Sequence, residues 1–264
     1  MNLSGNMTRV RAVRPLVHHI TNYVTVNDCA NMTLCAGGSP VMSDALEDVS
    51  EMTSVSDALV LNIGTLNDRT VESMMVSGAV ARKKGKPVVF DPVGAGATLY
   101  RTSVSKNIMH AVRPQVIKGN AGEIGVLSGS GGAVRGVDSS SSDDTASAVR
   151  KLARVQGCIV VATGPVDYVS DGDVVLELSN GTPMQESVSG TGCMLTSVVG
   201  CYVGALGVSL DSVVSAITAF NVAAEDAASL CNGPGTFKAA FMDAMHALDG
   251  DSLESRIRAS SVRP

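Results

Sequence analysis

Residues 58–90 have the sequence ALVLNIGTLNDRTVESMMVSGAVARKKGKPVVF, and this segment decides the fold. Its first part, Ala58–Ile63, is a mostly apolar run that is typical of a strand buried on both faces. A helix follows, with Asn67 or Asp68 as its cap and with Gly85 directly after a basic last turn. The final PVVF returns to a strand pattern. A strand, a helix and a second strand at this spacing predict a parallel sheet covered by helices.

The same alternation continues on both sides of this segment. Residues 167–178 (DYVSDGDVVLEL) predict a β-hairpin at one edge of the sheet, because an Asp-Gly pair lies between alternating residues. From Gly192 onward the chain is predicted to be helical throughout. Residues 129–144 are rich in Ser and Gly and predict a flexible loop. Further strands are predicted at 15–21, 40–42, 115–117 and 158–162, and further helices at 25–36 and 145–155.

Length and composition favour one α/β domain over residues 1–264, with no internal repeat or linker. The formal net charge is −5 and no block of five or six basic residues occurs, which argues against a nucleic-acid or anionic-membrane partner. The six cysteines form no C-x-x-C pair and are expected to be reduced thiols in a cytoplasmic protein. Residues 1–14 lack the apolar core of a signal peptide. Residues 193–210 are uncharged and nearly long enough to span a membrane, but their glycines and hydroxyls favour a buried core helix.

A glycine-rich turn, Gly190-Thr191-Gly192-Cys193, directly precedes this long apolar helix. Glycine allows the backbone to curl, and the start of a helix carries a partial positive charge of roughly +0.5. Gly190, Thr191 and Gly192 therefore predict an anion hole that suits phosphate, with Cys193 at its mouth. The alternative interpretation is a glycine turn into a packed helix with a buried cysteine.

Polar residues also follow the predicted strands, at the edge where α/β sheets bind their ligands. Asp91 follows PVVF, and Lys118 and Glu123 follow the strand at 115–117. Thr163 and Gly164 follow the strand at 158–162. This set suits a metal–triphosphate complex, with the two carboxylates for Mg²⁺ and the ammonium for phosphate. Taken singly, Asp91 could instead be a turn former before proline, and Glu123 a solvated residue on a first helical turn.

Six segments occur in this order along the chain: HHITNYVT, SPVMSDA, FDPVGAGAT, IKGNAGEI, VVATGPVDYVSDG and SGTGCMLTS. Together they resemble the hydroxyethylthiazole kinase family of the ribokinase-like superfamily, over residues 15–248. It implies a three-layer fold with a mostly parallel sheet, and transfer of the γ-phosphoryl group of ATP to a thiazole alcohol with Mg²⁺. It also implies a homotrimer with its active site between subunits. In such an enzyme Asn22, Met42 and Gly190 would bind the thiazole, Lys118, Thr163 and Gly164 would bind ATP, and Asp91 and Glu123 would lie at the metal.

The chain departs from this family at Lys118 and in the loop at 129–144, which is unusually rich in Ser and Gly. The family commonly has arginine where this chain has Lys118, which loses a bidentate contact with phosphate. Most ribokinase-like relatives have aspartate where this family has the cysteine that is Cys193 here. A thiolate there could accept the proton of the acceptor hydroxyl, yet phosphoryl transfer depends more on positioning and charge, so we expect a modest base or an orienting group.

Other functions remain open on the sequence alone. One is a ribokinase-like kinase for a hydroxymethylpyrimidine or a pyridoxal-type ring. Another is a nucleotide-binding regulatory module without turnover. A thiol hydrolase that uses Cys193 with His18 or His19 is disfavoured, because it would not need Asp91, Glu123 and Lys118 at neighbouring strand ends.

Overall fold

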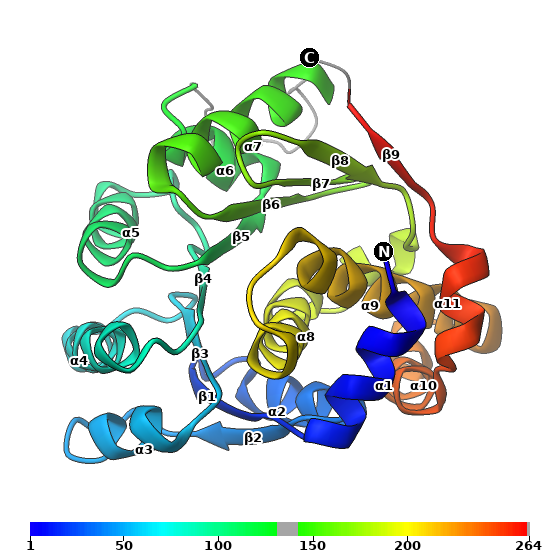
Figure 1. Ribbon diagram of the computed structural model, residues 1–264, viewed down its shortest axis with the longest axis horizontal. Helices are drawn as coiled ribbons and strands as arrows, with labels where there is room; N and C mark the ends of the chain where they lie inside the picture. Colours follow the sequence, from blue (N-terminus) through cyan, green and yellow to red (C-terminus); the bar gives the residue numbers. More distant parts are fainter. Residues whose placement is uncertain (131–141, 263–264) are drawn as a thin grey trace.

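The computed structural model describes residues 1–130 and 142–262, which form one nine-stranded sheet between two layers of helices (Figure 1). The strand order is β2-β1-β3-β4-β5-β6-β7-β8-β9. The first six strands in this order are parallel, and the last three pair antiparallel with their neighbours. The strands are β1 (Leu16–Ile20), β2 (Ser39–Met42), β3 (Ala58–Asn62), β4 (Val88–Asp91), β5 (Val116–Asn120), β6 (Ile159–Thr163), β7 (Asp167–Ser170), β8 (Val175–Leu178) and β9 (Ala259–Ser261).

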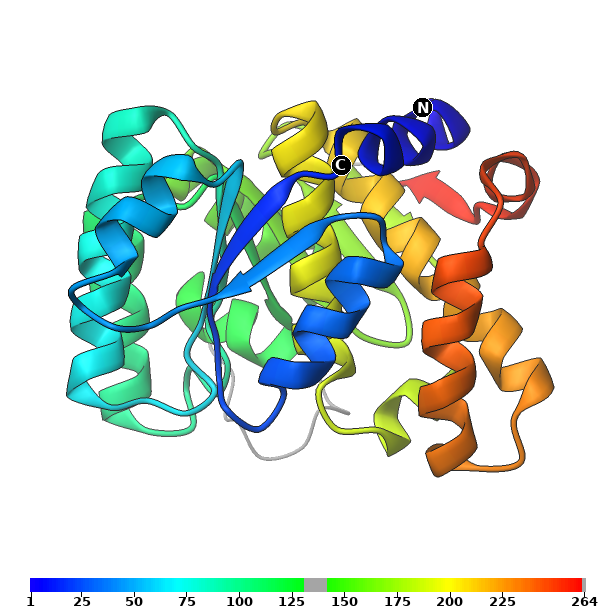
Figure 2. The ribbon, with the colours of Figure 1, turned by 90° about the horizontal axis from the view of Figure 1, so that it is seen from below.

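Helices cover both faces of this sheet. One layer contains α1, α2 and α8 to α11, and the other contains α3 to α7; Figure 2 shows cyan α4 and yellow α8 on opposite sides of the strands. The helices are α1 (Leu3–Val13), α2 (Val26–Cys35), α3 (Val49–Val55), α4 (Asp68–Lys84), α5 (Leu99–Val112), α6 (Ala121–Leu127), α7 (Ser142–Gln156), α8 (Thr191–Leu206), α9 (Leu210–Leu230), α10 (Pro234–Ala247) and α11 (Gly250–Arg256), with the 3₁₀ helix η1 (Pro183–Ser187) before α8.

The predicted unit at residues 58–90 is confirmed in detail. Every residue of β3 is buried. Asn67 caps α4 through a capping box with Thr70, and Gly85 ends the helix in the left-handed conformation. The apolar side chains of β3 and β4 alternate between two cores, one against α8 and α9 and the other against α4 and α5. Both faces of the sheet are thus packed, which fixes the positions of the strand ends.

Two parts of the chain differ from the sequence-based prediction. The chain after Gly192 is not helical throughout, because Ala259–Ser261 form β9. This strand pairs with β8 and takes the edge position that was predicted for the hairpin of β7 and β8. Helix α1 lies at the N-terminal end, where no element was predicted, and packs against α8 and α11.

The predicted loop at residues 129–144 is only partly described, because residues 131–141 lie outside the described residues. Helix α7 begins at Ser142, before the predicted start at residue 145.

Within the described chain, α9 is the one helix that is long and apolar enough to cross a membrane. Of its most apolar window, 72% is buried inside the protein, as in the core helix of a globular fold. Helix α8, which holds most of the apolar stretch at 193–210, is buried continuously from Met194 to Val203. Both helices pack into the core that faces β3 and β4. All six cysteines are free thiols.

Candidate active site

The carboxyl ends of β3, β4 and β5 bring three polar side chains together beneath α8. Residues two apart in a strand face the same side, so Asn62, Asp91 and Lys118 share a face with the apolar residues two positions before them, which pack against α8. Asn62 and Asp91 are aligned in the parallel register of β3 and β4. All three side chains are buried.

Asp91 and Lys118 form a buried ion pair, with Lys118 Nζ 3.2 Å from Asp91 Oδ2. The same carboxylate oxygen accepts hydrogen bonds from Thr196 Oγ1 at 2.6 Å and from Asn62 Nδ2 at 3.1 Å. Burial alone would lower the pKa of Lys118, but Asp91, with smaller contributions from Cys193 and Glu123, raises it above its usual value. Lys118 is therefore a permanent cation at this site.

The first turn of α8 meets this ion pair directly. Gly190 precedes the helix with φ 89°, and among the described residues no side chain caps it. The first hydrogen bond of the helix runs from Met194 N to Gly190 O. The N–H groups of Thr191, Gly192 and Cys193 come before it and therefore have no acceptor within the helix. Lys118 Nζ donates to Gly192 O at 3.1 Å. The predicted anion hole thus lies beside the Asp91–Lys118 pair.

Cys193 lies on this turn with its sulfur held by two amides. Asn62 Nδ2 and Asn22 Nδ2 lie 3.2 and 3.3 Å from Cys193 Sγ. Burial, and then the charge of Asp91, raises the pKa of the Cys193 thiol, although Lys118 and the hydrogen bonds of Thr25 and Asn62 act in the opposite direction. In the free protein Cys193 is therefore a thiol at neutral pH.

Glu123 lies at the start of α6, where it forms a capping box with Asn120. Its two oxygens accept hydrogen bonds of 2.7 Å from the amides of Gly94 and Asn120. It is on a first helical turn, as the alternative interpretation held, but it is buried and not solvated. Burial and the charge of Asp91 raise the pKa of Glu123. Glu123 thus ties the loop after β4 to the end of β5.

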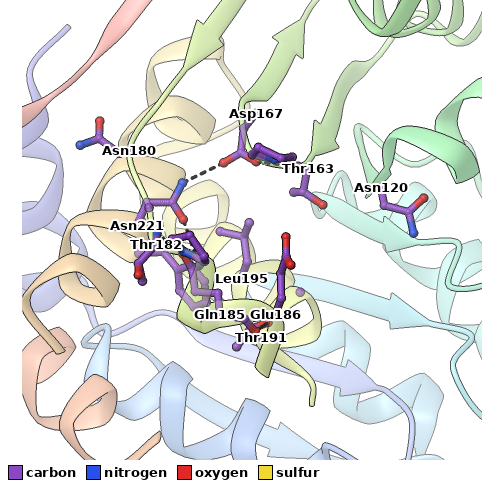
Figure 3. Close-up of a pocket in the computed structure, with 16 residues that line it drawn as sticks. Asn120, Thr163, Asp167, Asn180, Thr182, Gln185, Glu186, Thr191, Leu195 and Asn221 are labelled. Carbon is purple, nitrogen blue, oxygen red and sulfur yellow. Dashed lines mark hydrogen bonds between the residues drawn. The ribbon is translucent and has the colours of Figure 1, made fainter. Parts of the chain in front are cut away.

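A cavity of about 680 Å³ adjoins this cluster on the side of β6 and β7. Thr163 and Gly164 line it from the end of β6, and Thr191 and Gly192 line it from the first turn of α8. Figure 3 shows Asn120 and Thr163 on one side of this space and Asn180, Thr182 and Asn221 on the other. Thr163 and Gly164 thus share one cavity with two of the three anion-hole residues, whereas Lys118 and Gly190 do not line it, and Lys118 only contacts the cavity residue Gly192.

The inner wall of this cavity is a polar network centred on Asp167. Asp167 accepts hydrogen bonds from the amide of Gly164 at 3.1 Å and from Asn221 Nδ2 at 2.8 Å, the latter drawn in Figure 3. Gln185 Nε2 donates to Asn221 Oδ1, and Gln185 O accepts from Thr191 Oγ1. Burial raises the pKa of Asp167 to about 6. The network joins β7, α9 and the segment that leads into the glycine turn.

The residues predicted for the acceptor lie around Cys193 and at the end of β2. The Asn22 amide is buried and makes its hydrogen bonds within the protein, to Asn62, Cys193 and Thr25. Met42 is the half-buried last residue of β2, in register with His19 of β1. These two roles stay predictions.

His18 and His19 are both buried, on opposite faces of β1. His18 contacts Thr53 Oγ1 and Ser43 O, and His19 contacts Val17 O and Thr33 Oγ1. In the part of the chain that the structure describes, neither histidine is hydrogen-bonded to Cys193. This arrangement gives no support to a Cys–His hydrolase.

Sequence reasoning missed three groups that complete the site. Asn62 was the one polar residue in the apolar run at 58–63, and its place at a strand end was an available signal. Thr196 lies one helical turn after Gly192, which also could have been noticed. The Asp167–Asn221 contact joins residues 54 positions apart, and no local pattern indicates it.

A family model and two sequence relatives all point to the same family of kinases. The family model for the hydroxyethylthiazole kinase family matches residues 7–251. Hydroxyethylthiazole kinase of Methanocella arvoryzae is 48% identical over 258 residues, or 97% of each chain. That of Thermoanaerobacter pseudethanolicus is 49% identical over 93% of this chain and 94% of the relative.

Solved structures agree with these relatives. The structure of hydroxyethylthiazole kinase protein from Pyrococcus horikoshii OT3 matches with a TM-score of 0.92 and 38% identity, over 99% of both chains. A pyridoxal kinase from Staphylococcus aureus, with a TM-score of 0.63 and 17% identity over 80% of this chain and 87% of its own, shares the fold. The predicted ribokinase-like three-layer fold is confirmed.

Proposed function

The chain belongs to the hydroxyethylthiazole kinase family, and we propose that it transfers the γ-phosphoryl group of ATP to the hydroxyl of 4-methyl-5-(2-hydroxyethyl)thiazole, in thiamine biosynthesis or salvage. It is a phosphotransferase with an alcohol as acceptor. One observation carries the assignment of the site: the Asp91–Lys118 pair contacts the uncapped turn of α8 beside a cavity of about 680 Å³. A site that transfers a phosphoryl group needs fixed positive charge and free amides next to a space for the nucleotide.

The nucleotide occupies this cavity, with its terminal phosphates at the anion hole of Gly190, Thr191 and Gly192. Thr163 and Gly164 contact it from the end of β6. Lys118 has three N–H donors, and within the described chain Asp91 and Gly192 use two of them. The third remains for a phosphate oxygen. A lysine in this position acts as a point charge, without the bidentate contact of an arginine.

The residues present fit a Mg²⁺ ion that arrives with the nucleotide. Among the described residues no cluster of three or more His, Cys, Asp or Glu side chains could hold a metal, but Mg²⁺ usually keeps several waters and binds one or two carboxylates together with phosphates. Asp91 and Glu123 would hold it there, in part through its waters, because both oxygens of Glu123 and Oδ2 of Asp91 already accept hydrogen bonds within the protein. It would neutralise charge on the phosphoryl group as that group is transferred.

The acceptor hydroxyl approaches the γ-phosphorus from the side of Cys193, with Asn22, Met42 and Gly190 around the thiazole ring. The hydroxyl oxygen forms a bond to phosphorus while the bond from phosphorus to the bridging oxygen of ADP breaks. The hydroxyl proton passes to an oxygen of the transferred phosphoryl group, or to Cys193 in its minor thiolate form, while the thiol form of Cys193 orients that hydroxyl. Positioning and charge neutralisation by the α8 turn account for most of the rate, because the transition state is largely dissociative.

The enzyme works as a single-domain, cytoplasmic homotrimer with the acceptor pocket at a subunit boundary. Directly after Asn22, Tyr23 and Val24 are 76% and 62% exposed. Exposed apolar side chains beside a site favour contact with another subunit. Sedimentation equilibrium should give three chain masses, and a mass of one chain would contradict the trimer.

An assay of ADP release tests the reaction. The purified protein is given Mg-ATP with the thiazole alcohol, with a hydroxymethylpyrimidine, with pyridoxal, or with no acceptor. Stimulation by the thiazole alcohol alone is expected. Stimulation by pyrimidine or pyridoxal alone would assign a different acceptor, and equal release in all four reactions would indicate that the protein is no kinase for these alcohols.

A further inference from the structure

Asn62 lies between the two halves of the proposed site. On one side is the Asp91–Lys118 pair, and on the other are Cys193 and Asn22. Asn62 ends β3, directly opposite Asp91 in the register of β3 and β4, and only 2% of it is exposed. No solvent competes for its amide, so its contacts are set by the protein.

The amide of Asn62 uses all four of its hydrogen-bonding positions. Nδ2 donates to Asp91 Oδ2 at 3.1 Å and to Cys193 Sγ at 3.2 Å. Oδ1 accepts from Asn22 Nδ2 at 3.0 Å and from Gly64 N at 2.9 Å. A flipped amide would place N–H groups against these two donors, so only one orientation satisfies the site.

Asn22 fixes the sulfur from a second direction. Its Nδ2 donates to Cys193 Sγ at 3.3 Å as well as to Asn62, and its Oδ1 accepts from the amide and the hydroxyl of Thr25. The sulfur therefore receives two amide donors whose own orientations are locked. Asn62 differs from Asn22 in that it also holds the carboxylate of Asp91.

We infer that Asn62 is a positioning residue for phosphoryl transfer: one amide holds the sulfur of Cys193 and the carboxylate of Asp91 in a fixed mutual arrangement. It acts through these two side chains and does not touch substrate. The inference rests on the proposed function, since it assumes that Cys193 faces the acceptor and that Asp91 faces the phosphates. Loss of such alignment at a reacting centre typically costs about 100-fold in rate.

Two substitutions test this role. Asn62→Ala removes all four hydrogen bonds, whereas Asn62→Asp keeps an oxygen for Gly64 N and Asn22 Nδ2 but has at most one proton, so it cannot donate to Cys193 and Asp91 together. Asn6→Ala is the control, because the Asn6 amide makes two comparable donations, to Asp211 and Ser215, between α1 and α9. Steady-state kcat and both KM values are measured with the thiazole alcohol and Mg-ATP, and ATP binding is measured by calorimetry.

Both Asn62 variants should lower kcat by about 100-fold and leave the KM for ATP within about threefold, as expected for lost alignment. Asn6→Ala should keep the kcat of the wild type. In a Cys193→Ala background, Asn62→Ala should lower kcat by a clearly smaller factor, because one of its two partners is missing. A purely structural role would instead give equal factors in both backgrounds.

The outcomes separate the two claims. A wild-type protein that does not phosphorylate the thiazole alcohol contradicts the proposed function, and this inference with it. An active wild type with unchanged kcat in folded, ATP-binding Asn62→Asp overturns the inference alone. Should Asn62→Ala fail to fold, Asn62→Asp alone decides.

Discussion

The sulfur of Cys193 differs from an ordinary thiol in its surroundings. It accepts from two buried amides, and Asp91 lies close enough for its charge to raise the pKa of the thiol. A carboxylate at the same position would accept the same amide hydrogens and would be a stronger proton acceptor at neutral pH. Relatives with an aspartate here would therefore place a charged base where this chain has a neutral, orienting group.

Replacement of Cys193 separates these roles. Cys193→Ala should lower kcat by about 100-fold, the effect expected when a reacting hydroxyl loses its alignment. Cys193→Asp should keep or improve kcat, because its oxygens can accept from Asn22 and Asn62. Steady-state phosphorylation of the thiazole alcohol measures both. If folded, ATP-binding Cys193→Asp has no turnover, Cys193 is not a base.

Met42 offers a second prediction at this scale. The chain has few aromatic residues, so a small ring would pack against aliphatic and thioether side chains. Met42→Ala should raise the KM of the thiazole alcohol by about tenfold, which corresponds to lost apolar contact, and leave the KM of ATP nearly unchanged. Equal increases in both KM values, measured in one kinetic series, would contradict the placement of Met42 at the acceptor.

At the scale of elements, the strands and helices with a local pattern could be predicted, and those that depend on distant partners could not. β3 and α4 are specified by an apolar run, a capping box and a terminal glycine. β5 was predicted to end before Lys118 but continues through Asn120, because β6 pairs with it along that length. Lys118 is tolerated in a buried strand because it pairs with Asp91. The two residues are 27 positions apart, so no local pattern indicates the pair.

The edge strand β9 and the hydrogen bonds of the site also depend on partners that are distant in the sequence. β9 consists of one alanine and two serines, all exposed, and exists because it pairs with β8. Asp91, Lys118 and the glycine turn were expected to meet because strand ends of a parallel sheet share an edge. The hydrogen-bonded links among them, through Asn62 and Thr196, required coordinates.

The start of α8 gives a prediction at this scale. Gly190 has φ 89°, and a Cβ there would clash with Thr25 Cγ2. Gly190→Ala should therefore cost more than the roughly 1–2 kcal/mol of left-handed strain alone, displace the anion hole, and lower both ATP affinity and kcat. Calorimetric ATP binding and thermal unfolding measure these effects.

Gly85→Ala is the matched control for this element. Gly85 has φ 65°, and a Cβ there would meet nothing within 4 Å, so the variant should lose only stability. Thr25→Ser removes the clashing methyl group and should restore part of the activity of Gly190→Ala. A Gly190→Ala protein with wild-type ATP affinity would show that the turn does not bind phosphate.

At the scale of the whole molecule, two buried groups make stability depend on pH in opposite directions. Burial lowers the pKa of His19 to about 4 and raises the pKa of Asp167 to about 6. His19 is protonated below about pH 6.5 in the unfolded chain but only below about 4 in the folded protein. The free energy of unfolding therefore has its full contribution from His19 above about pH 6.5 and loses it as pH falls toward 4. The unfolded chain releases the Asp167 proton near 4, so stability from Asp167 is lost as pH rises from about 4 to 6.

These two slopes should nearly cancel between pH 4 and 6, and single substitutions should expose each of them. Relative to wild type, Asp167→Asn should make the free energy of unfolding rise with pH by up to about 1.4 kcal/mol per unit, and His19→Gln should make it fall by a similar amount. Urea unfolding at half-unit intervals from pH 4 to 7 measures both slopes.

His18 and Glu123, whose pKa values burial also shifts, remain in every variant, so their effects cancel when a variant curve is compared with the wild-type curve. Each substitution also changes hydrogen bonds, which displaces a curve without tilting it. Variant curves that run parallel to the wild-type curve would show that neither group changes its protonation on unfolding in this range.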